Sequence, residues 1–131
     1  MFENYDLFKT MIHLRPDGSA EASDPGGGRR TALAGDAESL WTLGAFHAES
    51  DTAVHAGYWE RHPNGHEVLF VFSGALRVYL RDEGPEPVTT LRAGQSFVVP
   101  PGRWHRLAVE EPADLLSITP RSGTEHEKAA A

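Results

Sequence analysis

The fold is decided by residues 94–105, which read GQSFVVPPGRWH. Residues 96–99 form a short apolar segment that is typical of a β-strand. Two prolines and Gly102 follow it and predict a tight turn, because proline presets φ and glycine accepts a positive φ. A second strand is expected over residues 104–109. The turn therefore places His105 near the start of a strand.

Similar short apolar segments, separated by turns, recur from residue 39 onward at intervals of about 8 to 12 residues, as in sandwiches and barrels. We expect eight strands, at residues 39–47, 53–62, 67–72, 75–81, 88–91, 96–99, 104–109 and 114–119. The turns carry suitable residues, for example Pro63-Asn64-Gly65 and Ser73-Gly74. The chain also has 13 glycines and 9 prolines, too many for a helical bundle. The expected class is all-β.

The segments outside this region differ from it. Residues 9–14 could form one short strand, and residues 15–30 read RPDGSAEASDPGGGRR, which predicts an irregular loop. Its glycines do not match the phosphate-binding pattern G-x-x-x-x-G-K-[ST]. We interpret Arg29 and Arg30 as a solvated loop end, with closure over an anionic substrate as the alternative. The chain is therefore divided into an N-terminal strand and loop region (1–38), a barrel domain (39–120) and a polar C-terminal tail (121–131).

Composition narrows the classes of function. The chain has 131 residues, no cysteine and a formal net charge of −7. This length fits one domain with a real core, and the lack of cysteine excludes disulfides and thiolate metal sites. The acidic balance argues against a nucleic-acid partner, because proteins that bind nucleic acid concentrate positive charge. No apolar run approaches the roughly 20 residues of a membrane-spanning helix, and no signal peptide is recognisable, so we expect a cytoplasmic protein without a membrane partner.

Polar residues converge in the expected strand at residues 53–62. Alternation places Tyr58, Glu60 and His62 on one face of that strand. The following turn reverses the chain and brings Glu67 back alongside them. Polar groups inside a barrel cost several kcal/mol unless they are paired or coordinate something. Their convergence suggests a metal site.

The opening stretch resembles the second motif of the cupin family, G-x5-P-x-G-x2-H. Gly94, Pro100, Gly102 and His105 match every fixed position of this motif through its His. The match places His105 among the metal ligands that the family uses.

An earlier stretch resembles the first cupin motif, G-x5-H-x-H-x3-4-E-x6-G. Glu67, six intervening residues and Gly74 match its second half, and His62 matches its second His. Glu60 occupies the position of the first His, and Gly57 stands closer to it than the pattern asks. The motif is therefore recognisable but altered at one ligand position.

The resemblance implies a small single-domain bacterial cupin, with a double-stranded β-helix, or jelly-roll barrel, that holds a divalent metal through Glu60, His62, Glu67 and His105. Such nitrogen and oxygen donors suit Fe, Mn, Ni or Zn. If all four bind, the two carboxylates neutralise the dication. If Glu60 does not bind, it becomes a candidate general base beside a two-His-one-carboxylate set. A further alternative is that Glu60 pairs with an interior Arg and no metal binds. Tyr58, on the same face as Glu60, is predicted to be a second catalytic residue.

The other histidines are not expected to bind the metal. By alternation His66 points to the surface or supports the site from outside, and His55 faces away from the interior. His47 could reach the mouth of the barrel. His13 and His126 lie near the ends of the chain, where no catalytic role is expected.

Several apolar or aromatic residues are assigned to packing. Arg103 and Trp104 are expected to rim the pocket, because they directly precede His105. Core or interface positions are expected for Trp41, Trp59, Phe70 and Phe72. Apolar stretches near residues 40–41 and 68–72 predict a homodimer.

The leading functional hypothesis is a metal-dependent enzyme that acts on a small organic molecule, as a dioxygenase, an isomerase or a lyase. The alternative is a non-catalytic cupin module that senses a metal or a metabolite, because fold does not decide function. A third interpretation is a cupin whose metal site has decayed.

Overall fold

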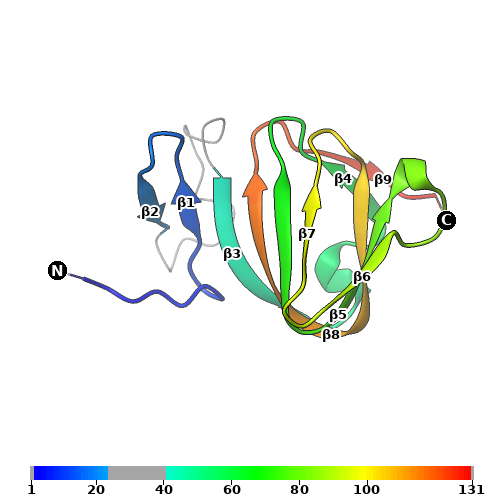
Figure 1. Cartoon of the computed structure of the whole chain (residues 1–131), viewed down its shortest axis with the longest axis horizontal. Helices are drawn as coiled ribbons and strands as arrows, with labels where there is room; N and C mark the ends of the chain where they lie inside the picture. Colours follow the sequence, from blue (N-terminus) through cyan, green and yellow to red (C-terminus); the bar gives the residue numbers. More distant parts are fainter. Residues whose placement is uncertain (1, 24–40, 131) are drawn as a thin grey trace.

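The computed structural model describes residues 2–23 and 41–130 and is nearly all β in these ranges (Figure 1). The glycine-rich stretch with Arg29 and Arg30 lies outside the described residues. The described strands are β1 (Ile12–Leu14), β2 (Ala20–Ala22), β3 (Trp41–Ala48), β4 (Tyr58–Arg61), β5 (Glu67–Leu80), β6 (Thr89–Arg92), β7 (Ser96–Val99), β8 (His105–Pro120) and β9 (Glu125–Lys128), and the short 3-10 helices are η2 (Asp51–Val54) and η3 (Arg81–Glu83). The all-β prediction is confirmed.

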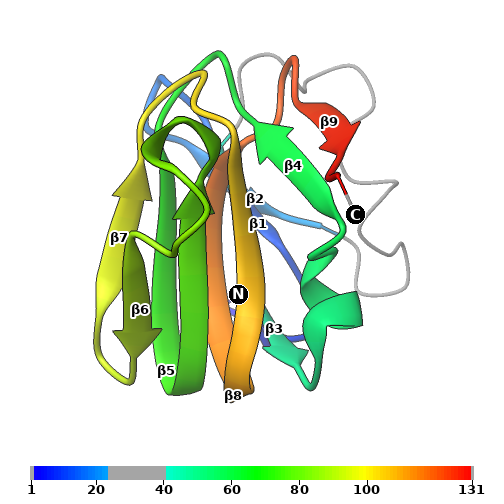
Figure 2. The same cartoon turned by 90° about the vertical axis from the view of Figure 1, so that its right-hand side faces the viewer.

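The strands form one folded sheet that remains open. Its order is β2-β1-β3-β8-β4-β9, and β5 pairs with β8 as well as with β6 and β7. Figure 2 shows β5, β6 and β7 in one layer and β4 and β9 in another. No pairing joins the end strands within residues 2–23 and 41–130. The expected jelly roll is therefore an open β-sandwich, and only its closure into a barrel is corrected. The end strands have only three or four residues and offer few backbone groups for a closing pair.

Two pairs of expected strands are each one continuous strand. Residues 67–72 and 75–81 belong to β5, and residues 104–109 and 114–119 belong to β8. The Ser73-Gly74 pair marks a register irregularity between β5 and β8 and does not reverse the chain. Gly74 has φ 81°, and a Cβ there would lie 2.0 Å from the Pro112 carbonyl oxygen. Glycine therefore serves a bend and a close backbone approach here.

Other boundaries also differ from the expectations. The first part of the expected strand at residues 53–62 contains the end of η2, and only Tyr58–Arg61 is strand. Strand β2 lies in the expected loop, and β9 lies in the expected polar tail. These two strands pair with β1 and β4, respectively. Strand β9 contains only polar residues, and β2 has only three residues, so neither presents an apolar pattern long enough to predict a strand.

The apolar core lies between the sheet layers, beside the site described below. Its buried members are Ala48, Leu69, Val71, Leu76, Val78, Leu91, Val99, Ala113 and Leu115. The aromatic residues assigned to core or interface are not fully buried: Phe72 is exposed, and Trp41, Trp59 and Phe70 are partly buried. The observed core therefore consists of aliphatic side chains. None of the described helices is long and apolar enough to cross a membrane.

Candidate metal centre

Four side chains from three strand regions meet at one end of the core. Glu60 lies in β4, His62 follows β4, Glu67 begins β5 and His105 begins β8. One donor atom from each residue lies within 4.8 Å of the donor atoms of the other three. His62, Glu67 and His105 are buried, and Glu60 is partly buried. The structure thus brings together all four residues named from the motifs.

Local backbone geometry explains this convergence. Glu60 and His105 are directly opposed in the antiparallel pairing of β4 with β8, which brings their side chains close together. The Pro100-Pro101-Gly102 turn holds the backbone of His62 in place, because the Gly102 N–H donates to the His62 carbonyl oxygen at 3.0 Å. Gly102 has φ 74°, a value that favours glycine.

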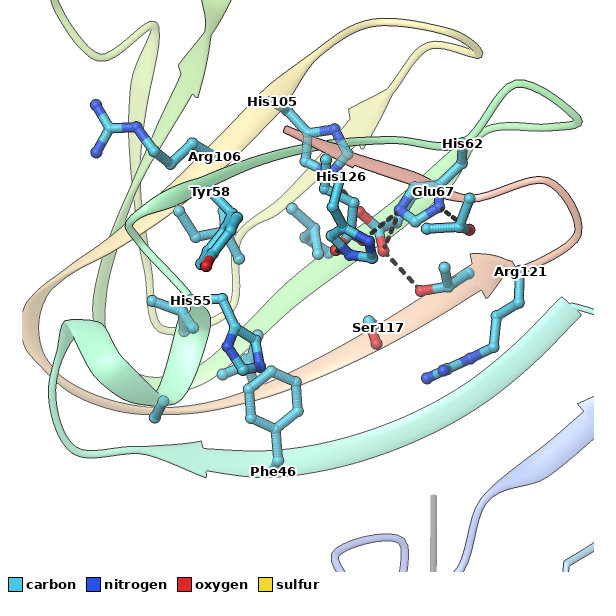
Figure 3. Close-up of a pocket in the computed structure, with 18 residues that line it drawn as sticks. Phe46, His55, Tyr58, His62, Glu67, His105, Arg106, Ser117, Arg121 and His126 are labelled. Carbon is cyan, nitrogen blue, oxygen red and sulfur yellow. Dashed lines mark hydrogen bonds and ion pairs between the residues drawn. The ribbon is translucent and has the colours of Figure 1, made fainter. Parts of the chain in front are cut away.

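The donor atoms of the four side chains face one another. His62 Nε2 lies 2.7 Å from Glu60 Oε1 and 3.4 Å from Glu67 Oε2, and His105 Nε2 lies 3.0 Å from Glu67 Oε1. His62 Nε2 is buried without a hydrogen bond of good geometry, despite its short distance to Glu60. Figure 3 shows the two imidazoles and Glu67 directed toward a common point.

Outer contacts orient these donors. His105 Nδ1–H donates to the Arg103 carbonyl oxygen at 3.1 Å, which leaves Nε2 as the acceptor nitrogen. That lone pair therefore faces a carboxylate oxygen of Glu67, an unfavourable arrangement without a proton or a cation between them. The Thr119 hydroxyl donates to Glu67 Oε2 at 2.6 Å. Nitrogen and oxygen acceptors arranged in this way suit a divalent cation, so the residues fit the metal that the family motif implies.

The charges of the site lead to the same conclusion. Burial alone would lower the pKa of His62, but its contacts with Glu60 and Glu67 raise it to about 9. Burial would raise the pKa of Glu67, but the His105 and His62 side chains beside it hold it well below its usual range. The pKa of Glu60 is lowered too, since contact with His62 outweighs burial. Two ionised carboxylates and one imidazolium leave an excess negative charge, which a bound cation would balance.

A cavity of about 640 Å³ adjoins the four donors. Apolar side chains on its wall include Phe46, Leu69, Leu107 and Leu115. Tyr58 also lines the cavity, and its side chain is exposed. The space is large enough for a small organic molecule.

Two histidines that the sequence interpretation placed elsewhere also line this cavity. His55, expected to face away from the interior, has φ 51° directly after η2; this left-handed residue breaks the alternation on which the expectation rested. His126, to which no role was given, lies opposite Glu60 on β9 and contacts Glu60 Oε2 at 2.8 Å. The residues around His126 are polar and exposed, so no apolar pattern in the sequence predicts a strand here.

The remaining expectations have mixed outcomes. His66 is exposed, in line with its expected surface position. His47 does not line the cavity and instead contacts Asp114 and Glu49 at the surface. His13 is buried beside Thr42.

The expectation that Arg103 and Trp104 rim the pocket is wrong. The Arg103 side chain turns outward to Asp82 and Glu83. Trp104 contacts the guanidinium groups of Arg61 and Arg81 through its ring. Among the described residues Glu60 pairs with His62 and His126 and with no arginine.

The family follows from a direct comparison. A model of the cupin domain matches residues 48–119, which is more than half of the chain. This match, together with the β-sandwich and the four convergent donors, defines a protein of the cupin class. The chain belongs to the cupin domain family. No curated protein matches it.

Solved structures show related folds. A cupin-2 domain protein from Shewanella frigidimarina is 28% identical, with a TM-score of 0.48 over 62% of this chain and 71% of that chain. A double-stranded β-helix protein from Klebsiella pneumoniae is 22% identical, with a TM-score of 0.50 over 70% of this chain and 71% of that chain. The hydroxypropylphosphonic acid epoxidase from S. wedmorenis is 22% identical, with a TM-score of 0.50 over 60% of this chain and 42% of that chain. The last two matches support the fold alone.

Proposed function

We propose that Glu60, His62, Glu67 and His105 bind one divalent metal ion and that the protein is an enzyme acting on a small organic molecule. The observation that carries this proposal is the buried convergence of two imidazole nitrogens with two carboxylates. Without a cation, this group keeps a net negative charge away from water. Bound Fe, Mn, Ni or Zn would neutralise both carboxylates and supply a Lewis acid or an oxygen-binding centre.

The chain's own residues would bind and orient the substrate. The apolar wall formed by Phe46, Leu69 and Leu115 would exclude water from the body of the molecule. Glu60 is partly exposed toward the cavity and is positioned either to bind the metal or to take a proton from the substrate. The Tyr58 hydroxyl at the mouth is a candidate proton donor. This arrangement supports an oxygenase, isomerase or lyase reaction.

A non-catalytic sensor would use the same fold, but the cavity favours an enzyme. A purely structural metal site is closed by protein ligands, whereas here the donor cluster opens onto a cavity of about 640 Å³. The homodimer, the cytoplasmic location and the division of the chain at residues 38 and 120 remain predictions.

Metal content is the direct test of the metal site. Protein purified without added metal would be measured by elemental analysis, before and after incubation with Fe(II), Mn(II), Ni(II) or Zn(II). We expect about one ion per chain, and loss of that ion in the His62→Ala and His105→Ala variants. His66→Ala is the matched control, because His66 is exposed and lies outside the cavity lining. Full metal stoichiometry in both site variants would refute the ligand assignment.

The enzymatic part of the proposal needs a separate measurement. Metal-loaded protein would be incubated with a panel of small oxygen-bearing molecules, with oxygen consumption and product masses recorded. Turnover that disappears in Glu60→Gln and Tyr58→Phe would support their catalytic roles. Tight ligand binding without turnover would instead favour the sensing module.

A further inference from the structure

We infer that the C-terminal strand β9 and Thr124, which directly precedes it, support the metal site, with Thr124 and His126 as positioning residues for His62 and Glu60. This inference rests on the proposed metal function. Thr124 Oγ1 lies 2.8 Å from His62 Nδ1, and His126 Nε2 lies 2.8 Å from Glu60 Oε2. Both residues also line the cavity. The segment from Thr124 to Lys128 thus contacts two of the four proposed metal ligands.

The backbone of β9 is placed by its pairing with β4. His126 is directly opposite Glu60, and Glu125 is opposite Arg61. Figure 2 shows the two strands side by side, apart from the layer that contains β5, β6 and β7. Because β4 carries Glu60 and precedes His62, a strand paired with β4 lies where its side chains can reach both donors.

Because successive side chains of a strand point to opposite faces, the two faces of β9 make different contacts. His126 points to the cavity, whereas Glu125 and Glu127 form ion pairs away from it. Glu125 Oε1 lies 2.8 Å from Arg61 Nη2, and Glu127 Oε1 lies 3.0 Å from Arg81 Nη1. These outer ion pairs hold the strand in place while its inner face contacts the site.

The arginines of these ion pairs are themselves held by aromatic contacts. Arg61 and Arg81 each place Cζ 4.7 Å from the centroid of the Trp104 ring. Trp104 directly precedes His105, so the stack links the outer face of β9 to the start of β8. A guanidinium fixed by an indole loses less freedom when it pairs with a carboxylate, which makes the anchor of β9 firmer than an isolated surface ion pair.

The inner contacts select the donor geometry that a metal needs. When His126 Nε2–H donates to Glu60 Oε2, the other oxygen, Oε1, remains directed at His62 Nε2. When His62 Nδ1–H donates to the Thr124 hydroxyl, the Nε2 lone pair of His62 points into the site. Loss of either contact would let a donor rotate, and outer partners of this kind commonly change metal affinity about 10- to 100-fold.

The test measures metal affinity, independently of any reaction. Dissociation constants for Zn(II) would be determined by competition with a chromophoric chelator, and the visible spectrum of the Co(II) form would report donor geometry. We expect His126→Ala and Thr124→Val to weaken Zn(II) binding about 10- to 100-fold and to alter the Co(II) spectrum. His126→Gln and Thr124→Ser keep a hydrogen-bonding group and should restore most of the affinity. Lys128→Ala is the matched control, because Lys128 lies on β9 outside the cavity lining.

Each outcome separates the inference from the function on which it rests. Unchanged affinity in His126→Ala and Thr124→Val, with tight binding by the wild type, would overturn the role of β9 and leave the metal site intact. Equal weakening in the alanine or valine variants and in their Gln or Ser counterparts would show that the hydrogen bonds are not responsible. A wild-type protein that binds no metal would refute the proposed function, and the inference with it. Circular dichroism of every variant would establish that the fold is retained.

Discussion

The metal-free protein should lose stability as the pH rises from 6.5 to 9, because a buried histidine holds a proton only in the native state. The pKa of His62 is raised from 6.5 to about 9 by Glu60 and Glu67, against the opposing effect of burial. Between these values the native state keeps a proton that the unfolded state releases. The unfolded state then binds fewer protons, so the free energy of unfolding falls with rising pH. The stabilisation is complete below pH 6.5 and lost as the pH passes through 9.

The size of the expected loss in unfolding free energy follows from the pKa shift of His62. The difference between 9 and 6.5 is 2.5 pH units, and each unit corresponds to about 1.4 kcal/mol. The full loss is therefore about 3 kcal/mol, or roughly 10 °C in melting temperature for a domain of this size. Because only 2% of the His62 side chain is exposed, solvent screening removes little of this energy.

Urea unfolding of chelator-treated protein at several pH values from 6 to 9.5 would measure this loss. The reference variant is His62→Gln, which carries no titratable group at this position. The exposed His47 also has a raised pKa, through its contacts with Glu49 and Asp114, so the difference between wild type and variant isolates His62. Identical pH slopes for the two proteins would refute the reasoning.

Three further predictions address the metal, the bend and the core. Zn(II) affinity should rise with pH by up to about tenfold per unit between pH 6.5 and 9, because the His62 proton must leave before Nε2 can bind a metal; a calorimetric titration that finds no pH dependence would contradict the assignment of His62. Gly74→Ala should destabilise the protein by at least about 1–3 kcal/mol in urea unfolding, because of its positive φ and its approach to the Pro112 carbonyl. Gly84→Ala should destabilise the protein less, because exposed Gly84 also has a positive φ but open space around it. Leu115→Ala, at a fully buried core position, should cost about 2–5 kcal/mol, and a loss below 1 kcal/mol would mean that the core rearranges around the deletion.

The four donors could be predicted from the sequence because short-range rules place them. Glu60 and His62 are two residues apart on one strand, and a proline-glycine turn fixes His105 relative to residues 94–100. Neither relation depends on knowing the rest of the fold. The family resemblance then joined the two halves of the site, which alternation alone left unconnected.

The rest of the site depends on long-range pairing and on local backbone exceptions. The contact of His126 with Glu60 spans 66 residues of sequence, and β9 has only exposed side chains, so no apolar pattern marks it. His55 reaches the cavity because one residue adopts a left-handed conformation, which a period-two argument does not anticipate. Ser73-Gly74 has the composition of a turn but forms an irregularity within one long strand.

The electrostatics of the site explain how the same four residues can serve both the metal-free and the metal-bound protein. Glu60 and Glu67 remain ionised near neutral pH because each contacts His62, and His62 in turn keeps a proton because both carboxylates surround it. The proton therefore acts as a partial substitute for a cation, since it leaves one negative charge uncompensated. A bound divalent metal would take the place of that proton with two positive charges, which would balance both carboxylates and leave His62 as a neutral ligand. Metal binding would thus be coupled to deprotonation of His62, and the contact between Thr124 and His62 Nδ1 favours the tautomer that metal binding requires.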